Sequence, residues 1–136
     1  MSRNDDGRES KGELKAWDLF RNMVALFNGV EEHAKAAERE ACCAGVLADR
    51  EGRTEALRAL REHMDATARY AKTARKYLEQ LRAMAEGGEH AHLENAETFM
   101  TKIEATAAIA TGARDALLEA LANGNTYGFV CKMSGL

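Results

Sequence analysis

The chain contains no proline, and the β-branched residues that favour strands are scarce. Nowhere do apolar and polar residues alternate over several positions, which is the pattern of a half-buried strand. Alanine, glutamate, arginine and leucine dominate instead, and these residues have high helix propensities. The sequence therefore predicts an all-α protein.

Other absences limit where the protein acts. No stretch approaches the roughly 20 apolar residues of a membrane-spanning helix, and the first ten residues lack the apolar core of a secretion signal. The chain has three cysteines, and two of them are adjacent. An odd number in this arrangement is more typical of a protein in a reducing compartment than of a disulfide framework. The net charge of −3 argues against binding nucleic acid with the whole surface. We expect a cytoplasmic protein that does not contact membranes.

Residues 13–30 form the most apolar stretch and contain the only tryptophan. Ser10 and Glu13 have the spacing of a capping box, in which the two side chains bond each other's free backbone N–H groups. We therefore expect a helix to begin there, after a polar arm of residues 1–12. Apolar residues continue at helical spacing to about residue 48. The pair Asn28-Gly29 either bends this helix or divides it in two.

Two further helical patterns follow, at about residues 54–85 and 89–122, and glycines separate the patterns. Each helix would be about 50 Å long, and short turns force such helices to fold back on one another. Residues 13–136 are therefore expected to form one domain, an elongated antiparallel bundle of three long helices. The number rises to four if the first helix breaks near Gly29. A short apolar segment, residues 125–136, follows the third helix.

We expect this bundle to work by holding a protein partner. Many positions on the helix seams are alanine, which allows close approach but buries less apolar area than leucine. Self-association or a partner protein would supply the missing burial. The candidate interface residues are aromatic residues of the first helix and apolar residues of the last segment: Trp17, Phe20, Phe27, Tyr127, Phe129, Val130 and Met133.

A mostly basic stripe runs along the second predicted helix. It consists of Arg58, Arg61, Arg69, Lys72, Arg75, Lys76 and Arg82. Such a stripe can follow a nucleic-acid backbone, with Tyr70 and Tyr77 beside it for base stacking. More often a charged stripe is solvated or pairs with acidic side chains. The candidate partners are Glu32, Glu38 and Glu40 of the first helix or Glu94, Glu97 and Glu104 of the third. Contact with a nucleic-acid backbone is therefore the second hypothesis.

A metal-like cluster occupies the turn E-G-G-E-H-A-H-L-E, residues 86–94. Glu89 and His92 have the E-x-x-H spacing of carboxylate-bridged di-iron bundles, and His90 and Glu94 are four residues apart. Those bundles need two such motifs and two further inward glutamates, whereas this chain offers one motif at a bundle end. A solvated cluster is the favoured interpretation, and a metal-binding bundle is the weakest of three hypotheses.

Nothing in the sequence indicates catalysis. Cys42 and Cys43 point about 100° apart on a helix, so they cannot share one metal ion. They are expected to be buried as small apolar residues, as is Cys131. No nucleophile has a base and an orienting partner, and no glycine-rich phosphate loop follows a strand. We expect no enzymatic activity, no cofactor and no small-molecule substrate. The leading hypothesis is an assembly or adaptor protein, as a homo-oligomer or as the small subunit of a larger complex.

Overall fold

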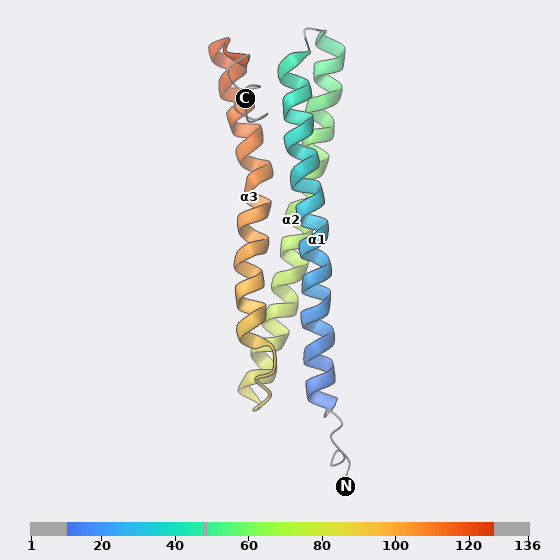
Figure 1. The fold of residues 1–136 in the computed structure, drawn as a ribbon, viewed down its shortest axis with the longest axis vertical. Helices are drawn as coiled ribbons and strands as arrows, with labels where there is room; N and C mark the ends of the chain where they lie inside the picture. The colour runs from blue at the N-terminus through green and yellow to red at the C-terminus, as the bar shows by residue number, and fades with distance from the viewer. Residues whose placement is uncertain (1–10, 48, 127–136) are drawn as a thin grey trace.

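A computed structural model describes residues 11–47 and 49–126 of the chain. Over these ranges the protein forms three α-helices and no strand: α1 (Lys11–Val46), α2 (Arg50–Glu86) and α3 (Leu93–Asn123). The helices pack along one another in an elongated bundle (Figure 1). The predicted all-helical bundle is confirmed. Most of the polar arm, and all four interface candidates from Tyr127 onward, lie outside the described residues.

Helix α1 is continuous through Gly29, so residues 11–47 and 49–126 form three helices and not four. Gly29 is half-buried against the ring of Tyr70 on α2. A β-carbon at this position would lie 2.6 Å from Cε2 of Tyr70. The glycine therefore permits a close approach of α2. Glycine destabilises a helix by about 1 kcal/mol relative to alanine. Packing of the α1 residues before and after Gly29 outweighs this cost.

The turn between α1 and α2 is shorter than predicted, because Asp49 caps α2. Its carboxylate accepts a hydrogen bond from the Gly52 N–H at 3.0 Å. Gly52 thus lies in the first turn of α2 and does not separate the first two helices as predicted. Arg53 then ties the two helices together, since its guanidinium donates to the backbone oxygens of Ala44 and Leu47. Ala44 lies in the last turn of α1 and Leu47 directly follows the helix, where backbone carbonyls have no partner within the helix.

The turn between α2 and α3 is longer than predicted. The third helix begins at Leu93 instead of near Glu89. Two residues of the turn have left-handed backbone, Gly88 with φ 104° and His92 with φ 65°. Glycine adopts this conformation freely, whereas histidine does so at a cost that its surroundings must offset.

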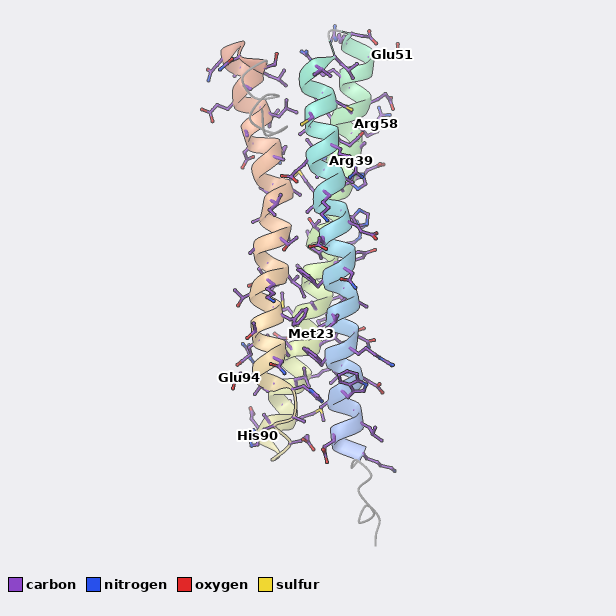
Figure 2. All side chains as sticks on the ribbon, in the orientation of Figure 1. Met23, Arg39, Glu51, Arg58, His90 and Glu94 are labelled. Atoms are coloured by element: carbon purple, nitrogen blue, oxygen red, sulfur yellow. The ribbon has the colours of Figure 1, made fainter. Side chains whose placement is uncertain are left out.

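The apolar core is divided into two clusters along the bundle. The first lies toward the α2–α3 turn and includes Met23, which points between the helices (Figure 2), Leu81 and Ile103. The second lies toward the α1–α2 turn and surrounds Leu60 and Leu117, with alanine at its other buried positions. Alanine keeps the helices close in this second half but contributes little apolar area.

Between the two clusters, the bundle has a section with little apolar burial, which we call the waist: residues 31–36 of α1 and 61–70 of α2. The buried residues described there are Ala34, Ala66 and Thr67. The Thr67 hydroxyl is satisfied within its own helix, since it donates to the Met64 carbonyl at 2.7 Å. No large apolar side chain described at the waist is fully buried, so polar contacts have more influence on helix packing here than elsewhere.

Candidate interaction site

Aromatic rings hold α1 against α3 at the end of the bundle near the α2–α3 turn. The Phe99 ring of α3 meets Phe20 edge-on at a centroid distance of 5.5 Å and Phe27 at 5.7 Å. Such pairs stabilise by about 0.5–1.5 kcal/mol each beyond the area they bury. All three rings are half-buried. Phe20 and Phe27 therefore have partners inside the bundle, and their contact with another protein stays a prediction.

Trp17 lies at the outer edge of this aromatic cluster. Its ring is 5.4 Å from that of His92 and 6.2 Å from that of Phe20, and the residue is 42% exposed. Leu14 precedes it by three residues on the same helix face and is 50% exposed. We call Leu14 and Trp17 the Trp17 patch. The chain thus presents two large apolar side chains side by side to solvent.

The other large apolar residues exposed in the described part of the chain do not form such a pair. They are Val46, Ile109 and Leu118. Ile109 and Leu118 lie nine residues apart on α3, which places them on opposite faces of that helix. Leu118 lines a groove of about 270 Å³ between α2 and α3, together with Leu57, Leu60, Arg61, Met64 and Arg114. The groove is a second apolar surface of the bundle.

The four residues of the metal-like cluster lie apart from one another in their contacts. Glu89 and His92 lie in the turn, so their spacing does not place them on one helix face. Glu89 accepts a hydrogen bond from the Ala91 N–H, and the His92 ring stacks on Phe20 at 5.5 Å. His90 and Glu94 are exposed at the same end of the bundle (Figure 2). Within residues 11–47 and 49–126, no group of three or more His, Cys, Asp or Glu side chains is placed to hold a metal ion.

The basic stripe on α2 is partly neutralised by acidic side chains. Three of its arginines form ion pairs: Arg58 with Glu55 at 2.9 Å, Arg75 with Glu104 at 2.7 Å, and Arg82 with Glu97 at 3.4 Å. These pairs are about half exposed and stabilise little. Arg69, Lys72 and Lys76 lie three and four residues apart on one face of α2, are exposed, and have no ion-pair partner among the described residues. These three residues and Arg61, which is also exposed and has no ion pair among the described residues, are the members of the stripe with cations free to contact phosphates.

The cysteine pair is less buried than predicted. Cys42 is half-buried and Cys43 is exposed, and both thiols are free. Burial, followed by the neighbouring Cys43 and Glu38, raises the pKa of the Cys42 thiol. A raised pKa disfavours the thiolate, which is the reactive form. Cys42 is therefore poorly suited to act as a nucleophile, and Cys131 lies outside the described residues.

Fold and surface together define a three-helix bundle with an exposed apolar patch at one end and free cations along α2. None of its described helices is long and apolar enough to cross a membrane. The chain matches no protein-family model, no curated protein and no solved structure. Function must therefore be inferred from the surface itself.

Proposed function

We propose that this is a non-enzymatic helical-bundle protein that acts through protein–protein contacts, as a homo-oligomer or as the small subunit of a larger complex. The Trp17 patch is the observation that carries the proposal. Tryptophan is among the residues that contribute most energy to protein interfaces. Here the rings of His92 and Phe20 pack against the only tryptophan, while much of its surface remains exposed to solvent. A ring fixed in this way loses little conformational entropy when a partner covers it.

The helix contacts support an antiparallel, coiled-coil-like arrangement for this bundle. Gly29 of α1 lies against Tyr70 of α2, and His33 lies against His63, so residue numbers rise along one helix as they fall along the other. A rigid bundle of this kind presents the patch at a fixed position. The free thiols described on α1 are compatible with a cytoplasmic location, which is part of the proposal.

The test is the mass of the protein in solution, measured by sedimentation across the micromolar range. We expect the native chain to associate with itself or to be isolated with a stable partner. The double variant Leu14→Ser/Trp17→Ser should weaken that association by about 30-fold or more, because tryptophan at an interface typically contributes about 2 kcal/mol or more.

The matched control is Ile109→Ser, which removes a comparably exposed apolar residue from α3. This variant should associate as the native chain does. A native protein that is monomeric throughout the range and recovers no partner would contradict the proposal. Equal weakening by the control would show that the patch is not the contact.

Contact with a nucleic-acid backbone is the alternative, and Arg69, Lys72 and Lys76 support it because all three are exposed and unpaired. Reversing the three to glutamate should abolish binding to DNA or RNA at low ionic strength. It should also reduce the salt dependence of binding, because the slope of the logarithm of the binding constant against the logarithm of salt concentration is about −0.7 to −0.9 per phosphate contact. Arg75→Glu, at an arginine already paired with Glu104, is the control and should weaken binding less. Absence of binding by the native chain at low salt would eliminate this alternative.

A further inference from the structure

His33 of α1 and His63 of α2 meet at the waist. Their Nδ1 atoms are 2.9 Å apart, and their ring centroids are 5.1 Å apart. The centroids are farther apart than the nitrogens, so the two nitrogens face each other between the rings. A neutral imidazole has one nitrogen that donates and one that accepts. The contact is therefore an N–H···N hydrogen bond in which one Nδ1 carries a proton and the other supplies a lone pair.

We propose that the His33–His63 pair is a pH-sensitive contact that closes the waist when it holds a single proton between the rings and opens it when both rings are charged. Two protonated Nδ1 atoms cannot face each other at 2.9 Å, because neither has a lone pair to accept a hydrogen bond. Two positive charges about 5 Å apart also repel each other. The second proton therefore requires the rings, and with them α1 and α2, to move apart.

The surroundings favour this response. The two rings line an open hollow of about 320 Å³ whose other lining residues, Glu32, Lys35, Ala36 and Arg39, all belong to α1. One acidic and two basic side chains there give a positive balance that opposes a second imidazolium. From α2, the Tyr70 ring packs against His33 at 5.5 Å. No residue of α3 lines the hollow as the structure describes it.

Because the His33–His63 pair lies at the waist, its separation affects the middle of the bundle. The apolar clusters on either side contain the large buried residues, whereas the waist buries only Ala34, Ala66 and Thr67 among the residues described there. Separation at the waist therefore exposes few fully buried side chains, and Met64 and Tyr70 are the partly buried waist residues that pack against the two clusters. The bundle can loosen locally in its middle without unfolding, and imidazole is the side chain whose charge changes in the physiological pH range.

The direction in which pH changes the stability of the protein follows from the number of protons that the folded and unfolded states bind. In the unfolded chain the two histidines are independent, so at acidic pH both bind a proton. In the closed bundle the second proton is opposed, so the unfolded state binds more protons and stability falls as pH falls. The loss occurs as pH decreases through the imidazole range.

The test is the equilibrium between folded and unfolded protein at about pH 7.5 and about pH 5, followed by chemical denaturation. We expect the folded-to-unfolded ratio to fall about tenfold more in the native chain than in His63→Gln or His33→Gln, since repulsion at this distance is on that order when partly solvated. Each variant leaves one imidazole without a second imidazole facing it. His90→Gln removes an exposed histidine from the α2–α3 turn and should retain the native pH dependence.

A second measurement does not depend on the variants folding. Imidazole nitrogen resonances of the native protein should show His33 and His63 titrating as one coupled pair, with amide exchange at the waist accelerating when the second proton binds. Independent titration of the two rings would overturn the proposal, and so would a pH dependence shared by the native chain and both variants. Separation of the two rings when a chelator is added at neutral pH would also overturn it, because a bound metal ion would then hold them together.

Discussion

Replacing Leu117 by alanine is expected to lower the free energy of unfolding by about 2–5 kcal/mol, whereas the same change at the adjacent Leu118 should cost less than about 1 kcal/mol. Leu117 is fully buried in the second core cluster, and Leu118 is 47% exposed. Most neighbours of Leu117 in that cluster are alanines, which have no flexible side chain with which to fill the cavity. The loss at Leu117 should therefore lie toward the upper end of the range.

Chemical denaturation of the two variants measures this difference directly. The pair is closely matched, because both changes remove the same atoms from adjacent positions of one helix and have the same effect on helix propensity. Similar losses in the two variants would mean that the second cluster does not form as described. A large loss at Leu118 alone would mean that α3 is rotated about its axis.

Gly29→Ala is expected to destabilise the protein by about 1–2 kcal/mol, although alanine is the better helix former. The added β-carbon would lie 2.6 Å from the Tyr70 ring, so the ring must be displaced from its place between α1 and α2. The same substitution at Gly112, in the middle of α3, meets no atom within 4 Å. Gly112→Ala should therefore stabilise by up to about 1 kcal/mol.

Opposite signs for the two glycine variants, measured by thermal or chemical denaturation, would confirm that Gly29 is required by helix packing. In a Tyr70→Ala background the clash is absent, and Gly29→Ala should then no longer destabilise. A stabilising Gly29→Ala in the native background would show that α1 and α2 are farther apart at this position than described.

The three helices could be predicted from the sequence because their apolar residues repeat every three or four positions over long segments. Their ends could be predicted less well. The run from Asp49 to Gly52 resembles a loop in composition, yet Asp49 bonds the Gly52 N–H and starts α2. The opposite error occurs at residues 89–92, where helix-compatible residues form a turn because His92 adopts a left-handed backbone and stacks on Phe20.

Contacts between helices could not be predicted from periodicity, because it fixes which face of a helix is apolar but not the register between two helices. The sequence does not single out Phe99, whose ring holds Phe20 and Phe27, or Leu14 beside Trp17. A signal for the histidine pair does exist. His33 is as far from the end of α1 at Val46 as His63 is from the start of α2 at Arg50, so two helices that fold back on each other bring the two residues opposite each other.

The Trp17 patch must be covered when the protein acts if it works through protein–protein contacts. Because Trp17 is the only tryptophan, its fluorescence reports on this patch alone. Acrylamide quenching of the native protein should be strong at high dilution, where Trp17 is 42% exposed, and should fall as the chain associates with itself or is titrated with its partner. Quenching that stays strong when the measured mass shows a complex would contradict the proposal, because the interface would then lie elsewhere on the bundle.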